Sequence, residues 1–411
     1  MPARARRRER LRARRGVAAE FKKILRSPGP AMIQIDASQG NGGGLILRGA
    51  LVLSSITGQA VRLTRIRARR CSPGLKPQHL RLVEVMARLC DASVEGASIG
   101  SQTLLFEPRG DVRGGGLIDV ATPGSVTLLL QTLFLPLAFS GRITRLRLSG
   151  ITHAPRSPSP ESLAWNWLPM LEDAGYRGET SLQKVGFAPR GGGIVHATIH
   201  PVATPIPLSL TERGRLLRVG GLSSVAGLDF SVAERQRRHV VSRLQGLHVP
   251  VEVVPGVVSA AVPGAFVFLT AEFEHARQSF FAPGQLGKPA ETVAGEAVDA
   301  LLASLGGGGA VDQHLANQLL LPLAFADGMS EIATSRVGEH LLAMAELIGR
   351  FFPASVDVHG SVGEPGMIAV HGAGVPARSH EQPPLDVGRL PEWHGMAAAA
   401  AASASLPLPA R

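Results

Sequence analysis

The stretch QLLLPLAFADG at residues 318–328 decides the fold, because the chain contains it more than once. Residues 131–141 read QTLFLPLAFSG, with the same LPLAF core and the same spacing from glutamine to glycine. Residues 48–58, RGALVLSSITG, form a third and more divergent copy. A stretch that recurs in this way indicates an internal repeat. Each copy predicts a buried helix of about three turns, which the glycine ends in the left-handed conformation.

The segments after each copy also correspond. Alternating apolar and polar residues at 61–69, 142–150 and 329–337 predict strands, and amphipathic stretches at 78–90, 161–175 and 339–352 predict second helices. The predicted fold class is therefore α/β (α+β), with three repeated βαβαββ-type units in one large domain. Residues 201–288 interrupt the pattern with their own strands and helix, which is enough for a smaller inserted α/β domain.

This pattern predicts the domain organisation. We expect a basic, disordered tail at residues 1–31, a large domain at 32–200 plus 289–372, the inserted domain at 201–288, and a disordered, Pro-, Ala- and Ser-rich tail at 373–411. The basic segment is either an arm that binds RNA non-specifically or a translated leader, since Met32 directly precedes the first strand. We favour the leader.

Composition narrows the class of protein. The net charge is +11, but residues 1–31 carry eleven Lys and Arg against two Glu, so almost all of the basicity lies in that segment. Two cysteines, Cys71 and Cys90, provide no disulfide framework and favour a reducing, cytoplasmic location. No apolar run reaches the ~18 residues that span a bilayer, so no membrane association is expected.

Polar residues occupy one equivalent position in each repeated helix: Arg48, Gln131 and Gln318. Such residues are unusual on helices that are otherwise apolar. Each could satisfy a buried backbone group, or the three could converge and line a ligand pocket. The repetition alone leaves both interpretations open.

A glycine-rich loop and an arginine-rich loop lie in the first unit. The glycines at 40 and 42–44 precede a predicted helix, where backbone N–H groups can approach an anion, although a tight turn explains them equally well. Arg67, Arg69, Arg70 and Lys76 follow between a strand and a helix. Because guanidinium groups bind phosphate oxygens bidentately, the sequence predicts a phosphate-binding wall here.

Eight phrases, in order across residues 32–372, resemble the RNA 3′-terminal phosphate cyclases, whose fold has repeated units and a small inserted domain. The phrases are IDASQGNGGGLILRGALVLSSITGQ, IRARRCSPGLKPQHL, VEGASIGSQTLLFEP, LLLQTLFLP, FAPRGGG, LGKPAETVAGEA, VDQHLANQLLLPLA and HLLAMAELIGRFFP. The resemblance implies ATP-dependent conversion of an RNA 3′-terminal phosphate to a 2′,3′-cyclic phosphate, with Mg²⁺ or Mn²⁺. It implies an adenylylated histidine and an RNA(3′)pp(5′)A intermediate, with AMP and diphosphate released.

The resemblance also implies roles for individual residues. The nucleophile would be His340, which stands at a predicted helix start where the helix dipole disfavours imidazolium. The ATP contacts would be Gln131, His314, Leu315, Ala316, Asn317 and Gln318, with His314 against adenine. The RNA 3′-phosphate and the triphosphate would be held by Arg48, Arg67, Arg70 and Gln78.

The sequence departs from the family pattern at functional positions. Asn41 replaces a family glutamate that resembles a metal ligand, and Asn317 replaces an aspartate, so metal affinity should fall. Ala343-Met344 replaces a family Thr-Asn pair, and Arg69 a glycine. The alternative is therefore a catalytically weakened relative that binds RNA or assists ribosome assembly. An enolpyruvyl transferase, which shares a related repeated architecture, is a third hypothesis. The sequence indicates neither the physiological RNA nor the oligomeric state.

Overall fold

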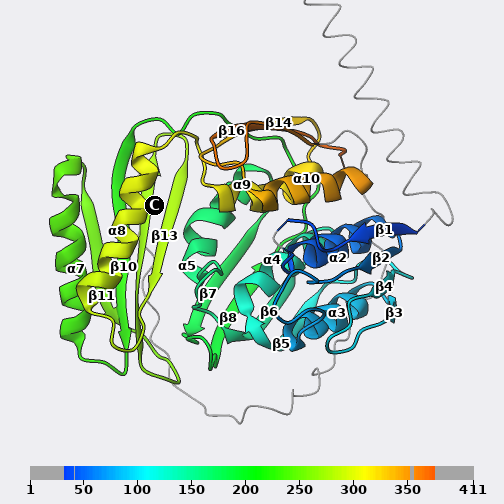
Figure 1. Cartoon of the computed structure of the whole chain (residues 1–411), viewed down its shortest axis with the longest axis horizontal. Helices are drawn as coiled ribbons and strands as arrows, with labels where there is room; N and C mark the ends of the chain where they lie inside the picture. Colours follow the sequence, from blue (N-terminus) through cyan, green and yellow to red (C-terminus); the bar gives the residue numbers. More distant parts are fainter. Residues whose placement is uncertain (1–31, 41, 352–355, 375–411) are drawn as a thin grey trace, which may run out of the picture.

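The computed structural model describes residues 32–40, 42–351 and 356–374. It has a large body with three sheets and a smaller body with one (Figure 1). The predicted tail at residues 1–31, and residues 375–411 of the predicted C-terminal tail, lie outside the described residues. The α/β fold class is confirmed.

The first sheet of the large body has the strand order β1-β2-β4-β3. Strands β1 and β2 are parallel, and β4 is antiparallel to both β2 and β3. A helix connects the parallel pair, as a parallel connection requires. The elements are β1 (Ile33–Asp36), α2 (Leu45–Thr57), β2 (Val61–Thr64), α3 (Pro77–Leu89), β3 (Ser93–Glu95) and β4 (Leu104–Glu107).

Two further sheets repeat this order and pairing, as β5-β6-β8-β7 and β9-β14-β16-β15. The second unit contains β5 (Gly116–Ser125), α4 (Val126–Ala138), β6 (Thr144–Ile151), α5 (Pro160–Ser162), the π-helical turn η1 (Leu163–Trp167), α6 (Leu168–Asp173), β7 (Gly178–Lys184) and β8 (Gly193–Ile199). The third contains β9 (Ser209–Leu210), α9 (Gln313–Ala324), β14 (Met329–Thr334), α10 (Glu339–Phe351), β15 (Val356–His359) and β16 (Gly366–His371). Three copies of one βαβαββ unit would produce this shared order.

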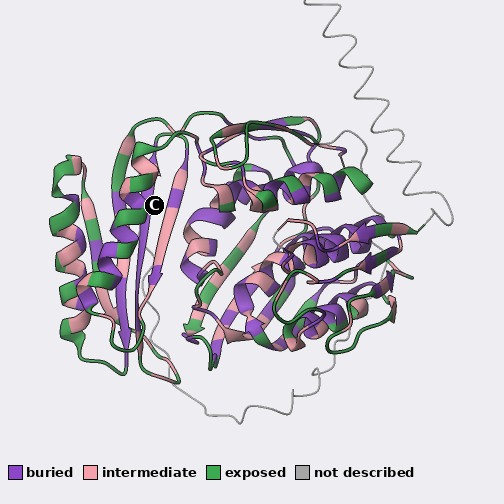
Figure 2. Ribbon diagram, viewed as in Figure 1, coloured by how far each residue is buried: buried purple, intermediate pink, exposed green. Residues whose placement is uncertain are grey.

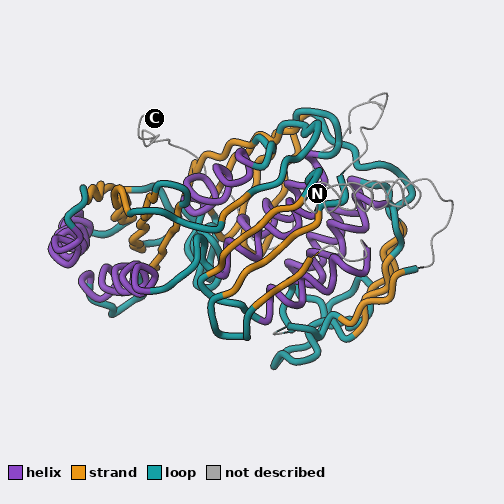
Figure 3. The backbone as a smooth tube through the Cα atoms, turned by 90° about the horizontal axis from the view of Figure 1, so that it is seen from above, coloured by secondary structure: helices purple, strands orange, loops and turns teal. Residues whose placement is uncertain are grey.

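The three sheets lie around the helices of the large body (Figure 3). One apolar cluster extends from Ile35 in β1 to Ala373 after β16 and includes residues from all three units. The central helices are therefore buried on most faces, as Figure 2 shows for α2. Helix α2 contacts α4 and α10, and α10 contacts α9, so segments far apart in the sequence meet at the centre of this body.

The smaller body has the strand order β11-β10-β12-β13, with two helices on one face of the sheet. Its elements are β10 (Leu216–Ala226), α7 (Phe230–Leu244), the 3-10 turn η2 (Gln245–Leu247), β11 (Val251–Val257), β12 (Gly264–Phe273), β13 (Arg277–Pro283) and α8 (Ala290–Gly306). Helix α8 packs against α7, β12 and β13, and its apolar residues belong to the core of this body. The boundary predicted at 288/289, which assigned this helix to the large domain, is therefore wrong.

The position of the insertion also differs from the prediction. Strand β9 comes before the small body in sequence, yet it pairs with β14 of the third unit. The small body therefore lies within the third unit, between its first strand and its first helix, rather than between units two and three. The sequence did not reveal β9 because the strand has only two residues.

The repeated helices begin before the repeated stretches, and two of the three end earlier than predicted. The side chains of Ser125 and Asp312 accept backbone N–H groups and cap α4 and α9, which sets the start of each helix before the repeated glutamine. Gly58 ends α2 in the left-handed conformation, at φ 73°, as predicted. Helices α4 and α9 instead end at Ala138 and Ala324, before their glycines.

An aromatic interface joins the two bodies. Trp165 in η1 contacts Phe268 in β12 with ring centroids 5.4 Å apart, and His153 lies 4.4 Å from the Phe266 ring. His153 is buried, and its Nε2 lies 3.2 Å from a carboxylate oxygen of buried Glu161. The ring contacts hold the small body against the large one, and the His153–Glu161 pair lies on the large-body side of this interface.

Tyr176 connects the second and third units. Its hydroxyl donates to the carbonyl of Pro322 in α9 at 2.9 Å, and its ring is fully buried. Tyr176→Phe retains the ring but removes this donor, so we expect the free energy of unfolding to fall by about 1 kcal/mol. Urea titration measures the change. An unchanged midpoint would show that the hydrogen bond contributes nothing to stability.

Candidate active site

His340 lies in the first turn of α10, as the sequence predicted, and its side chain is partly buried. The glycine loop that follows β1 packs against this turn. A Cβ atom added to Gly40 would lie 3.6 Å from Cδ2 of His340 and 3.5 Å from the carbonyl of Glu339. Gly40 also has a φ of 60°. The backbone conformation therefore favours glycine at this position, and the two distances show how closely the loop packs against His340.

The pKa of His340 lies below its ordinary value. Burial is the largest cause, and the charges of Arg48, His314 and Arg70 act in the same direction, whereas Glu339 opposes them. These residues come from α2, α9 and the loop after β2, so the fold brings them together around the imidazole. The ring is neutral at neutral pH, as a nucleophile must be.

Arg48 lies in the first turns of α2 and is partly buried. Burial lowers the pKa of its guanidinium to about 10. Among residues 32–40, 42–351 and 356–374, no carboxylate forms a salt bridge with Arg48. A buried cation without a counter-charge is costly, and a bound anion would remove that cost.

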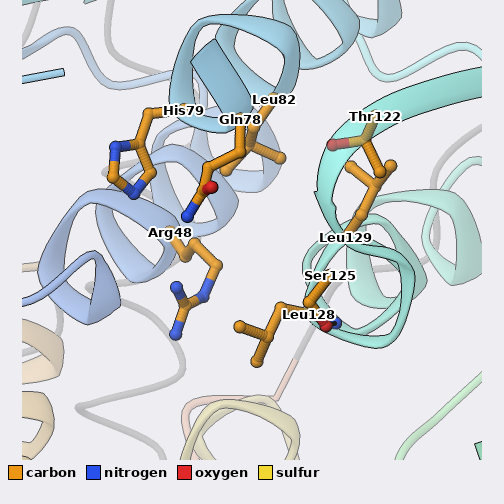
Figure 4. Close-up of a pocket in the computed structure, with 8 residues that line it drawn as sticks. All are labelled: Arg48, Gln78, His79, Leu82, Thr122, Ser125, Leu128 and Leu129. Atoms are coloured by element: carbon orange, nitrogen blue, oxygen red, sulfur yellow. Dashed lines mark hydrogen bonds between the residues drawn. The ribbon is translucent and has the colours of Figure 1, made fainter. Parts of the chain in front are cut away.

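A pocket opens beside this guanidinium, between α2, α3 and α4 (Figure 4). The guanidinium of Arg48 and the amide of Gln78 point into the space between the helices. A Cβ atom added to Gly44, the N-cap residue of α2, would lie 3.1 Å from Nη1 of Arg48 and 2.9 Å from Nε2 of His79. The lining residues are Arg48, Gln78, His79, Leu82, Thr122, Ser125, Leu128 and Leu129.

The predicted arginine wall is only partly directed at this site. Gln78 lines the pocket, and the charge of Arg70 reaches His340. Arg67 has a φ of 54° and donates to the carbonyl of Ser72 at 3.2 Å, so part of its binding capacity is used within its own loop. The pKa of Arg67 is lowered by burial and by the neighbouring charge of Arg70.

The predicted nucleotide-binding segment forms the start of α9. His314 is exposed, whereas Asn317 and Gln318 are partly buried. The Oδ1 atom of Asn317 is buried without a hydrogen-bond partner in the described part of the chain. Leu315 and Ala316 pack in the main core, because the helical period turns them inward. Only the polar members of the segment remain candidates for side-chain contacts with a nucleotide.

The three equivalent polar residues do not cap backbone groups in a common way. The Nε2 atom of Gln131 is buried and has no hydrogen-bond partner among the residues that the structure describes. Arg48 faces the pocket instead. For these two residues, the arrangement favours ligand contact over satisfaction of a neighbouring carbonyl. Whether Gln318 converges with them stays a prediction.

A protein-held divalent cation does not fit the described residues. No group of three or more His, Cys, Asp or Glu within them could hold a metal ion. The predicted ligand Asn41 lies outside the described residues.

Within residues 32–40, 42–351 and 356–374, no helix is long and apolar enough to cross a bilayer.

A family model described as RNA 3′-terminal phosphate cyclase matches residues 39–358. The chain belongs to this family. An RNA 3′-terminal phosphate cyclase from Methylococcus capsulatus is 41% identical over 349 residues, which cover 83% of this chain and 97% of the relative. A second from Pseudomonas fluorescens is 43% identical over 319 residues (77% and 92%), and a third from Thermococcus gammatolerans is 38% identical over 339 residues (82% and 97%).

A solved EPSP synthase from Acinetobacter baumannii aligns with 86% of this chain and 67% of its own, at 14% identity and a TM-score of 0.30. This likeness is too low to carry a functional conclusion.

Sequence reasoning missed several residues that line the pocket of the candidate site. His79, Thr122 and Ser125 line the pocket beside Arg48 but were not predicted as site residues. His79 follows the predicted phosphate-binding Gln78 directly and stands at a helix start, which was the available signal. Thr122 and Ser125 gave no signal, because only the contact between α3 and β5 brings them to the pocket.

For a self-adenylylation in which His340 is the nucleophile, the acid limb of the pH profile should report the protonation of this imidazole. Because the pKa of this imidazole is lowered, kcat/KM for self-adenylylation should stay high at neutral pH and fall only below about pH 6.5, the ordinary imidazole value. His314→Gln removes one of the charges that lower this pKa, so its acid limb should move to higher pH. Arg243→Gln, in α7, is the control and should not move it. A profile that is identical in all three proteins would contradict this electrostatic picture.

Proposed function

We propose that this chain is an ATP-dependent RNA 3′-terminal phosphate cyclase that works through an adenylylated His340. The observation that carries the proposal is a neutral imidazole within electrostatic range of Arg48, a partly buried cation that has no carboxylate partner among the described residues. The first group can attack a phosphorus atom. The second needs an anion, and a polyphosphate supplies one.

The reaction proceeds in three steps. A ring nitrogen of His340 attacks the α-phosphorus of ATP, the bond to the β-phosphate oxygen breaks, and diphosphate leaves. An oxygen of the RNA 3′-phosphate then attacks the same phosphorus and displaces the imidazole, which gives RNA(3′)pp(5′)A. Finally the vicinal 2′-hydroxyl attacks the 3′-phosphorus, loses its proton and expels AMP, which leaves the 2′,3′-cyclic phosphate.

The surrounding residues supply positive charge and hydrogen bonds where negative charge develops. Arg48 and Arg70, both near His340, would stabilise the leaving diphosphate. Gln78 and Arg67 would hold the RNA 3′-phosphate. The orphaned amide atoms of Gln131 and Asn317 would meet the nucleotide, because each is buried without a protein partner in the described residues.

Mg²⁺ or Mn²⁺ would enter with the polyphosphate rather than through a protein cage. Small divalent cations often bind in this way, through substrate phosphates and few protein ligands. We therefore assign no step to the cation. A cytoplasmic location and an RNA with a 3′-terminal phosphate as partner complete the proposal.

The test is covalent labelling with ATP radiolabelled at the α-phosphate, in Mg²⁺ and separately in Mn²⁺. We expect label that survives denaturing electrophoresis and is released by RNA ending in a 3′-phosphate. Absence of label in both metals would overturn the proposal. Tight RNA binding in that case would indicate the alternative, a weakened relative that only binds RNA.

A further inference from the structure

His79 is a buried histidine whose two ring nitrogens have different surroundings. It occupies the third position of α3, and only 5% of its surface is exposed. The backbone N–H of Lys76 donates to Nδ1 of His79 at 3.1 Å. This contact ties the imidazole to the start of the helix, as a capping-box residue does.

That hydrogen bond determines where the proton of the neutral ring lies. Because Nδ1 accepts a hydrogen bond, the proton must be on Nε2, which is then a donor. The ring is neutral at physiological pH, since burial and the charges of Arg67, Arg48 and Lys76 lower the pKa of His79 to about 4. The pocket thus contains a donor of fixed orientation that carries no charge.

Nε2 of His79 lies beside the Arg48 guanidinium and the N-terminus of α2, and both side chains line the pocket. It converges with Nη1 of Arg48 on Gly44, where a Cβ atom would lie within 3.1 Å of both nitrogens. Gly44 is the N-cap of α2, a helix of thirteen residues whose first N–H groups point outward at this end. The charges that act on His79 are all positive, and the residue lines the pocket, so Nε2–H is placed to donate to a bound anion.

We propose that His79 is a phosphate-binding residue that donates its Nε2–H to a phosphoryl oxygen held by Arg48. The inference rests on the proposed function and assigns a further residue to the same site. The phosphoryl group belongs either to the RNA 3′ end or to the polyphosphate of ATP. A fixed neutral donor adds directional recognition without adding another buried charge to the pocket.

His79→Gln separates the binding role of this side chain from its structural role. Glutamine at the third helical position can still accept the N–H of Lys76, as in a capping box, but it no longer places a donor beside Arg48. The melting temperature should therefore stay close to that of the wild type. The matched control is His196→Gln. His196 lies in β8, where its Nε2 contacts Oε1 of Gln183, and it does not line the pocket.

The experiment has two arms. The first compares the affinity for a short RNA with a 3′-phosphate with that for the same RNA with a 3′-hydroxyl, in the absence of ATP. The second measures the KM for ATP in self-adenylylation. A hydrogen bond to a charged phosphate contributes roughly 10- to 100-fold in affinity, so His79→Gln should lose that factor in one arm. A loss in the first arm would identify the RNA 3′-phosphate as the bound group, and a loss in the second would identify the polyphosphate of ATP.

The outcomes distinguish the inference from the function on which it rests. If His79→Gln and His196→Gln both match the wild type in the two arms, the inference is overturned while the cyclase proposal stands. Equal weakening for 3′-phosphate and 3′-hydroxyl RNA, with an unchanged KM for ATP, would also overturn it, since a structural defect has that effect. A wild type that neither forms an adenylate nor prefers the 3′-phosphate would overturn the proposed function itself.

Discussion

Replacement of His340 by alanine is expected to abolish the covalent adenylate and, with it, cyclisation. No other group can take the place of a nucleophile, so the rate should fall on the order of 10⁴-fold or more. Addition of pre-adenylylated RNA, RNA(3′)pp(5′)A, should restore the final step, because that step no longer needs the imidazole. Labelling with radioactive ATP and analysis of the RNA ends measure the two effects separately.

The matched control is His371→Ala in β16. This histidine is exposed and lies 3.2 Å from Asp357, in the same unit as His340. The His371→Ala variant should be labelled by ATP as fast as the wild type. Persistence of the adenylate in His340→Ala would show that another residue is the nucleophile.

Replacement of Arg48 by methionine is expected to make the free protein more stable and the enzyme much less active. The guanidinium is partly buried without a carboxylate partner in the described residues, so an apolar side chain of similar length should raise the free energy of unfolding by about 1 kcal/mol. Loss of the cation should lower kcat for self-adenylylation roughly 100-fold or more. Thermal denaturation with and without diphosphate, together with the labelling rate, tests both changes.

Arg81→Met provides the opposite case. Arg81 is buried, but it donates hydrogen bonds to Glu84 at 2.9 Å and to the carbonyl of Ala121 at 3.0 Å. Arg81→Met removes these hydrogen bonds and leaves their acceptors unpaired, so it should lower the free energy of unfolding. If Arg48→Met were the less stable variant and still formed adenylate at the normal rate, Arg48 would be a structural residue.

The repeated stretches made most of the large body predictable from sequence. Apolar periodicity marked α2, α4 and α9, and the alternating segments marked β2, β6 and β14, because each element buries one consistent face. Periodicity could not assign α8. Its apolar residues face the sheet of the small body, and a helix pattern does not identify the sheet that it covers. Strand β9 was too short to have a period.

Residues of the candidate site could be predicted where a reactive or charged side chain stands at an unusual position in the sequence. His340 at a helix start and Arg48 on an apolar helix both stood out as polar residues in unusual places, and the structure places them within electrostatic range of each other. Leu315 and Ala316 were included because they belong to a matching phrase, although helical geometry turns them into the core. His79 required the three-dimensional arrangement, since only the fold shows that its Nε2 faces Gly44.

The most direct measurement of the central claim is the position of the adenylyl group in the wild-type protein. The protein would be incubated with ATP and Mg²⁺ or Mn²⁺, digested without acid to preserve a phosphorus–nitrogen bond, and analysed by mass spectrometry. The account predicts AMP on the peptide that contains His340, and its disappearance when RNA with a 3′-phosphate is added. AMP on any other residue, or an unmodified His340 peptide in both metals, would contradict the account.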